Sequence, residues 1–200
     1  MTTASARPPY IRPLVVVVLV LCGCGSPTPV APVRVVDLVR ELERADKRPA
    51  DGFVQVESRI GDAAHAAIAA AVPSRLTLPL PLPRHGVLHT FVALAESPAG
   101  TPAATVRLRA GVSDARIYEN LAELTLTSGT RTWQELRVDL SAYAGWKWSL
   151  FYRPEEVTWR VVLAADATDS VPATVLWGAP GISTDTISAR EYVARRQRMR

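Results

Sequence analysis

Apolar and polar residues alternate along most of the chain after residue 50, which is the pattern of β-strands with one face in a core and the other in water. The clearest stripes run from Leu76 to Leu82, from Val106 to Val112 and from Leu136 to Leu140. Similar apolar runs occupy residues 54–56, 87–95, 146–153, 159–165 and 174–177. Turn residues separate these runs, so the sequence predicts about eight or nine strands.

Few helical segments interrupt the strands. The fold class is therefore expected to be all-β, an antiparallel two-sheet sandwich over residues 50–183. Within it, Pro79, Pro81 and Pro83 alternate with leucines. Because proline cannot donate a ladder hydrogen bond, this strand is expected at the edge of a sheet.

Apolar residues at helical spacing flank the expected sandwich. Val35, Leu38 and Leu42, with charged residues between them, predict a short amphipathic helix over residues 34–48. We favour a role for this helix as a cover over one sheet edge, in preference to a partner-binding role. Helix is also indicated at residues 115–124 and in a basic tail, residues 184–200.

A short leader precedes these elements. Two arginines come before an unbroken apolar run from Leu14 to Leu21, which is far shorter than the ~20 residues that cross a bilayer. The segment Leu21-Cys22-Gly23-Cys24 resembles the bacterial lipoprotein signal, in which a small residue precedes the cysteine that receives the lipid. The resemblance implies removal of residues 1–23 and lipid attachment at Cys24. Ordinary secretion is the alternative.

The lipoprotein resemblance implies a body anchored at the bacterial cell envelope, on the periplasmic side of a membrane, and leaves open which membrane. Residues 24–33 contain Gly25, Ser26 and three prolines, a composition typical of an extended tether. Both cysteines of the chain, Cys22 and Cys24, lie at the junction of the leader and this tether. No internal disulfide is expected in the body, which core burial alone must stabilise.

The charged residues are unevenly distributed. The chain has 23 lysines and arginines against 19 aspartates and glutamates. The basic excess lies at the two ends, which hold Arg7, Arg12, Arg190, Arg195, Arg196, Arg198 and Arg200. The body between them is slightly acidic, which argues against a nucleic-acid partner. We expect the C-terminal arginines on a solvated helical end, in preference to a contact with anionic lipid.

The three histidines of the chain, His65, His85 and His89, do not form a recognisable metal motif. His85 and His89 are expected on one face of a continuous strand, about 13 Å apart, which is too far for a shared metal ion. Each histidine is therefore expected to be a packed or solvated side chain. No metal and no cofactor is expected.

Two later segments resemble parts of jelly-roll domains of the galactose-binding-like type. These are residues 133–145, a strand and turn, and the closing segment Trp177-Gly178-Ala179-Pro180-Gly181-Ile182. The resemblance implies a jelly roll with a binding or accessory role. The region is also similar to the sandwich that precedes the sulfatase domain in some bacterial lipoproteins, which implies a sulfatase-like enzyme as a partner. Residues 71–75 resemble the sulfatase motif, but Ala71 stands at the nucleophile position and carries no reactive atom.

Aromatic residues of the later half supply the candidate ligand contacts, because sugar rings stack on aromatic faces. Those expected near loops or on the face away from the core are Trp146, Phe151, Arg153 and Trp159. The sequence thus predicts a non-catalytic module, with no catalytic residue, that binds a glycan or an envelope protein.

Two alternatives to this function stay open. One is a carbohydrate-active enzyme that uses carboxylates of the pairs Glu155–Glu156 or Asp166–Asp169, although adjacent acids of this kind are more typical of turns than of a glycosidase pair. The other is a split accessory module of a sulfatase.

Overall fold

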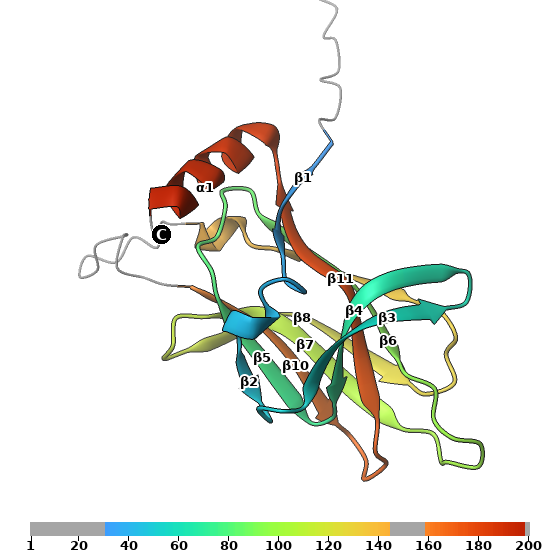
Figure 1. Cartoon of the computed structure of the whole chain (residues 1–200). Helices are drawn as coiled ribbons and strands as arrows, with labels where there is room; N and C mark the ends of the chain where they lie inside the picture. The colour runs from blue at the N-terminus through green and yellow to red at the C-terminus, as the bar shows by residue number, and fades with distance from the viewer. Residues whose placement is uncertain (1–30, 145–158, 199–200) are drawn as a thin grey trace, which may run out of the picture.

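The computed structural model describes residues 31–144 and 159–198, and these form two antiparallel sheets packed face to face (Figure 1). The first sheet has the order β3 (Phe53–Ile60), β4 (Ala63–Ala71), β11 (Thr174–Thr184), β6 (Val87–Leu94) and β9 (Gln134–Asp139), and β1 (Val33–Asp37) also pairs with β11. The second sheet has the order β2 (Asp46–Arg48), β5 (Ser74–Pro79), β10 (Arg160–Ala167), β7 (Thr105–Ser113) and β8 (Tyr118–Thr127). Short 3₁₀ turns, η1 (Leu42–Arg44) and η2 (Ser141–Tyr143), and one helix, α1 (Thr186–Arg198), complete the described part.

The chain alternates between the two sheets. Only β3–β4 and β7–β8 form hairpins between consecutive strands of one sheet among the described elements, and the other connections pass from one sheet to the other. This is the expected all-β, two-sheet jelly-roll sandwich.

The core lies between the sheets and is built from the alternating apolar stripes. Leu76, Leu108 and Leu163 from the second sheet, and Ile68 and Trp177 from the first, are all at most 1% exposed. The predicted stripes over Val106–Val112 and Leu136–Leu140 are confirmed, because their apolar members are buried on strands β7 and β9 or, for Leu140, directly after β9. Burial of these side chains is the main favourable contribution to folding.

The prediction of a helix over residues 34–48 is wrong. This segment forms β1, η1 and β2, although its apolar residues Val36, Leu38 and Leu42 are buried as expected. Val36 pairs with Ile182 of β11. The β-branched valines of this segment suit an extended strand, and pairing with β11 supplies backbone hydrogen bonds that override the helical spacing.

The prediction of a helix over residues 115–124 is also wrong. Most of this segment belongs to β8, which pairs along its length with β7. Asp114 accepts hydrogen bonds from the amides of Arg116 and Ile117 and so forms the turn of a β-hairpin. Pairing with the neighbouring strand therefore decides the secondary structure of this segment, and the helical spacing of its apolar residues does not.

Strand β4 was not predicted, because its sequence is mostly alanine, which has a low strand propensity. It forms because it lies between β3 and β11, where it is hydrogen-bonded on both sides.

The edge position expected for the proline-containing strand is wrong as well, since β2 pairs with residues Arg75–Thr77 of β5. Pro79 is compatible with this because the pairing with β2 reaches only to Thr77, opposite the first residue of β2.

The C-terminal helix predicted within residues 184–200 is present as α1, which packs beside β1 at one end of the sandwich (Figure 1). Tyr192 is 2% exposed. Arg195 donates to the carbonyl of Leu82 at 2.6 Å, and Arg196 pairs with Glu41. The expectation of a solvated helical end is therefore wrong for these two arginines, which hold the helix against the body.

Several predictions fall outside the described residues: the leader 1–23, Cys24, most of the tether 24–33 and the strand over 146–153. Within residues 31–144 and 159–198, no helix has the length and apolar character needed to cross a membrane.

The start of α1 offers a test of how the helix is held. Asp185 accepts hydrogen bonds from the amides of Ile187 and Ser188 and from the Ser188 hydroxyl, the pattern of a helix N-cap. These bonds, those from Ser188 foremost, lower the pKa of the Asp185 carboxyl below its ordinary value of 3.8. A lowered pKa in the folded state means that the stabilisation is present above the ordinary pKa and is lost as pH falls through the folded value.

We therefore predict that Asp185→Ala lowers the melting temperature at neutral pH and that its difference from the wild type shrinks below about pH 4. Asp185→Asn is the matched control, because asparagine also caps helices but does not titrate; it should melt near the wild type at neutral pH. Thermal unfolding followed by circular dichroism measures both. Equal melting temperatures of wild type and Asp185→Ala at neutral pH would contradict the cap.

Candidate functional site

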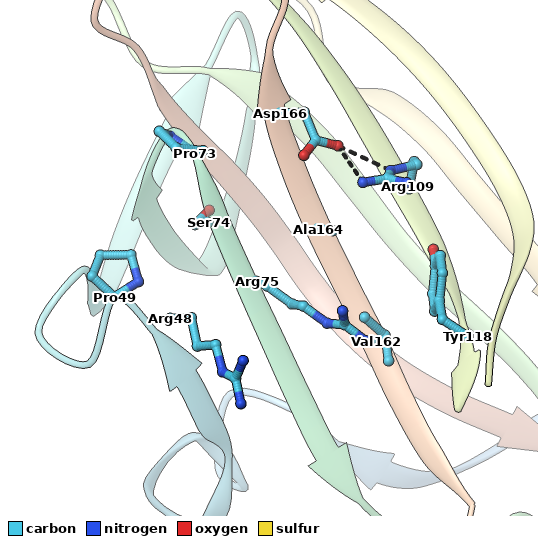
Figure 2. Close-up of a pocket in the computed structure, with 10 residues that line it drawn as sticks. All are labelled: Arg48, Pro49, Pro73, Ser74, Arg75, Arg109, Tyr118, Val162, Ala164 and Asp166. Carbon is cyan, nitrogen blue, oxygen red and sulfur yellow. Dashed lines mark hydrogen bonds and ion pairs between the residues drawn. The ribbon is translucent and has the colours of Figure 1, made fainter. Parts of the chain in front are cut away.

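The outer face of the second sheet carries two adjoining pockets. The larger has a volume of about 420 Å³ and the smaller about 270 Å³. Both are lined by Arg48, Arg75 and Tyr118. The larger adds Arg109 and Asp166 (Figure 2), and the smaller adds Asp46, Arg116 and Arg160. We refer to the two together as the arginine pocket.

The register of the sheet brings these residues into line. Arg48 of β2 is opposite Arg75 of β5, which is opposite Ala164 of β10, which is opposite Arg109 of β7. Residues directly opposite each other lie on the same face of a sheet. The small residue in the centre of this row leaves a depression between long side chains. Ala164 and Val162 form its floor and are almost fully covered, at 6% and 0% exposed.

Tyr118 is the wall that the two pockets share, and two guanidinium groups lie over its ring. The Cζ atom of Arg75 is 5.3 Å from the ring centre and that of Arg109 is 5.9 Å from it, which is cation–π geometry. Burial raises the pKa of the Tyr118 phenol, and the neighbouring guanidinium groups oppose this increase. The phenol therefore stays neutral and donates to Asn120 at 3.2 Å.

Gly111 makes room for the tyrosine. A Cβ atom at this position would overlap the carbonyl oxygen of Glu119 and would lie 3.0 Å from Cε2 of Tyr118. The pairing of β7 with β8 shifts register between Ala110 and Gly111, which is the effect of a β-bulge. The bulge and the missing side chain together allow β8 to approach closely and Tyr118 to lean across the sheet.

The arginine side chains differ in how well they are neutralised. Asp166 accepts from both Nε and Nη2 of Arg109, at 2.9 and 2.7 Å, and this pair is about one-third exposed. Arg48 is 3.6 Å from Asp46 in an exposed pair. The Nε atom of Arg160 is buried and has no hydrogen-bond partner. The pocket thus contains a buried donor that lacks an acceptor.

Of the ligand contacts predicted from sequence, Trp146, Phe151 and Arg153 lie outside the described residues. Trp159 is buried, with 8% of its surface exposed, and packs edge-on against Tyr143 at a ring-centre distance of 5.0 Å. The expectation that it is exposed is wrong, because η2 covers it, and we place it in the core.

The carboxylate pair Asp166 and Asp169 does not face a shared cleft. Asp166 is bound to Arg109, whereas Asp169 accepts hydrogen bonds from the amides of Thr105 and Val171 and so forms a turn. Glu155 and Glu156 lie outside the described residues. The geometry of the described carboxylates supports structural roles and not the acid–base pair of a glycosidase.

The prediction that His85 and His89 lie on one face of a continuous strand is wrong. His89 lies on β6, but His85 lies in the preceding turn with a φ of 52°, so the two do not share a strand face. Within the described part of the chain, no three side chains of histidine, cysteine, aspartate or glutamate are close enough to hold a metal ion.

A second cluster, of aromatic rings, covers the outer face of the first sheet. His65 stacks on Phe91 with ring centres 4.4 Å apart, and Trp133 meets His65 edge-on at 5.1 Å. Trp133 also donates to the carbonyl of Ala63 at 3.1 Å, and its ring lies over Gly178. Because these rings pack on one another, the cluster serves to cover the sheet, and the arginine pocket is the better candidate site.

The residues that line the arginine pocket were not among the predicted ligand contacts. Arg109 had a usable signal, since the alternation along β7 places it on the wet face. Arg48 and Tyr118 lie in segments whose spacing favoured helix, and Arg75 lies directly before the predicted stripe that begins at Leu76. These residues can be placed together on the outer face of the second sheet only when their segments are assigned as strands.

Comparison with known proteins gives similarity of fold only. No family model matches the chain, and no curated protein matches it. Among solved structures, the CBM51-2 and INT domains of Clostridium perfringens ZmpB match with 15% identity over 66% of this chain at a TM-score of 0.46, and this chain spans only about a quarter (26%) of that one.

Two smaller structures match over most of their own length. The CBM22-1 xylan-binding domain of Paenibacillus barcinonensis Xyn10C has 13% identity over 70% of this chain and 85% of its own, with a TM-score of 0.43. TmCBM61 in complex with beta-1,4-galactotriose has 10% identity over 71% of this chain and 88% of its own, with a TM-score of 0.41. Similarity at this level defines no shared ligand, so the ligand chemistry rests on the pocket itself.

The packing of Tyr118 gives a direct test of the pocket wall. We predict that Gly111→Ala destabilises the protein by about 1–3 kcal/mol, because the new methyl group overlaps the Glu119 backbone and displaces Tyr118. Thr105→Ala, which places an alanine on the same face of β7 away from the pocket, is the control and should cost less than about 0.5 kcal/mol. Denaturant unfolding measures both. A stability of Gly111→Ala equal to that of the control would show that the bulge does not depend on the glycine.

Proposed function

We propose that the protein is a non-catalytic carbohydrate-binding module, held at the periplasmic side of a bacterial membrane by a lipid on Cys24, and that the arginine pocket is its saccharide site. The observation that carries the proposal is the arrangement of fixed guanidinium groups around Tyr118 above a floor of small residues. In this role the module brings the envelope, or an enzyme bound there such as a sulfatase, to a polysaccharide.

The chemistry of the pocket suits a sugar better than an apolar small molecule. Pockets for apolar ligands are enclosed and lined mainly by hydrophobic side chains. This pocket is open on a sheet face, and its lining combines arginine, aspartate, serine and threonine with prolines and Tyr118. Guanidinium and carboxylate groups offer the planar, directional hydrogen bonds that hydroxyl-rich ligands need. Between them, the short side chain of Ala164 leaves room for a sugar ring.

Binding is also favoured over catalysis by the state of the carboxylates. A glycosidase needs one carboxyl to act as an acid and a second to act as a base or nucleophile. Asp166, the carboxylate of the larger pocket, is held by two contacts with Arg109 and so already has a structural partner. The described part of the pocket therefore supports recognition of a ligand and not its cleavage.

Loss of the shared wall should abolish binding. On a glycan array, Tyr118→Ala in the mature chain is expected to lower affinity by about tenfold or more, because it removes the surface that positions Arg75 and Arg109. Val54→Ala is the control, since Val54 is 58% exposed on β3 of the other sheet. The absence of any glycan ligand for the wild-type chain would refute the proposed function. Binding that is unchanged in Tyr118→Ala would refute the site.

The anchor is tested separately. After expression in a bacterium with a lipoprotein-processing pathway, the mature N-terminus is expected at Cys24 with covalent acyl groups, and the protein should sediment with membranes. Cys24→Ser should shift it to the soluble periplasmic fraction, and Cys22→Ser, which changes the neighbouring cysteine, should not. Mass spectrometry of the N-terminal peptide decides the matter. An unmodified Cys24 in the wild type would contradict lipid attachment.

A further inference from the structure

The arginine pocket carries more positive than negative charge. Five arginines and two aspartates line its two parts. This excess is local, because the body of the chain between its basic ends is slightly acidic. An accumulation of guanidinium groups on one face of a slightly acidic body needs a physical explanation, since like charges at close range repel one another.

Arg75 and Arg160 are two of the arginines that make up this excess. Arg109 is neutralised by Asp166, and Arg48 has a looser partner in Asp46. Arg75 lies over the Tyr118 ring, a contact that leaves the edge of its guanidinium group available for hydrogen bonds. Arg160 has a buried Nε without an acceptor. Both arginines line the smaller part of the pocket.

A buried donor without an acceptor costs free energy and is rare in folded proteins. In the smaller part of the pocket, the side chains around Arg160 are Thr77, Ser113 and Tyr118 together with other arginines, and the one carboxylate in that lining is Asp46. Thr77 and Ser113 are buried at 7% and 6% exposure. The position thus has charge and donors in excess and is open to a ligand that brings an anionic oxygen.

We infer that the ligand is an acidic saccharide, whose carboxylate or sulfate group lies in the smaller part of the pocket and accepts hydrogen bonds from Arg75 and Arg160. This inference rests on the proposed function and names the class of saccharide. The guanidinium fork matches the oxygen atoms of a carboxylate or a sulfate, and such charge-assisted bonds are the strong ones. The adjoining sugar ring then lies in the larger part, beside Ala164.

A saccharide fits this charge pattern better than the phosphate backbone of a nucleic acid. The cationic region is short and has acidic residues on both sides, Asp46 on β2 and Glu123 on β8. A long polyanion lying across the sheet would meet these carboxylates. An isolated acid group on a sugar ring would meet mainly arginines, since Asp46 is the one carboxylate in the lining of the smaller part.

The inference is tested by a matched pair of ligands. Isothermal titration of the mature chain with trigalacturonate and with its methyl ester compares the same sugar with and without its charge. We expect the acid to bind at least about tenfold more tightly than the ester, since the ester cannot form the charge-assisted bonds, and this preference should fall as the salt concentration rises. A sulfated oligosaccharide and its desulfated form are the second pair, and they distinguish sulfate from carboxylate.

Variants locate the acid group. Arg160→Gln and Arg75→Gln should each remove most of the preference for the acid over the ester. Arg107→Gln is the matched control, because Arg107 is exposed on the same face and lines neither part of the pocket. Thermal unfolding confirms that each variant is folded. If Arg160→Gln does not fold, Arg75→Gln, which removes an exposed side chain, still decides the question.

The outcomes separate this inference from the function on which it rests. Equal binding of acid and ester in both ligand pairs, lost in Tyr118→Ala, would overturn the acidic saccharide and keep the carbohydrate-binding function. Absence of binding to any saccharide would overturn both. A preference for the acid that survives in both arginine variants would overturn the assigned position, and tighter binding of an oligonucleotide than of any acidic saccharide would overturn the ligand class.

Discussion

The register of β10 with its two neighbours is the constraint on which both the core and the pocket depend. It places Leu163 opposite Leu76 and Ala110 inside the sandwich, and Ala164 opposite Arg75 and Arg109 on the outside. Because side chains alternate, a slip of β10 by one residue would bury Arg160 and Asp166 and expose Leu163. Burial of unpaired charge is far costlier than loss of an ordinary contact. The core therefore selects the register, and the register assembles the pocket.

The pocket keeps several guanidinium groups close together through contacts among its own side chains. Asp166 neutralises Arg109, and the ring of Tyr118 lies beneath both Arg109 and Arg75. All of these residues are on paired strands, so little conformational entropy is lost when a ligand binds. The remaining cationic excess gives the site its proposed selectivity, because it is stabilised further only by a ligand that carries a negative group.

The sequence predicted the fold well and the site poorly, for one physical reason. Alternation is a local property, and it correctly placed the buried residues of β7 and β9 and left Arg109 facing water. Strand pairing is not local. Pairing with β5 and β7 turned the segments that contain Arg48 and Tyr118 from expected helices into strands β2 and β8. Trp159 was expected on the surface because the covering ring of Tyr143 comes from a distant turn.

Backbone amide shifts in NMR spectra of the mature chain, titrated with an acidic oligosaccharide, test the central claim most directly. The account predicts that the largest shifts occur on the outer face of the second sheet, at Arg75, Gly111, Tyr118 and Arg160. Shifts that are largest on the opposite sheet, around His65, Phe91 and Trp133, would contradict it.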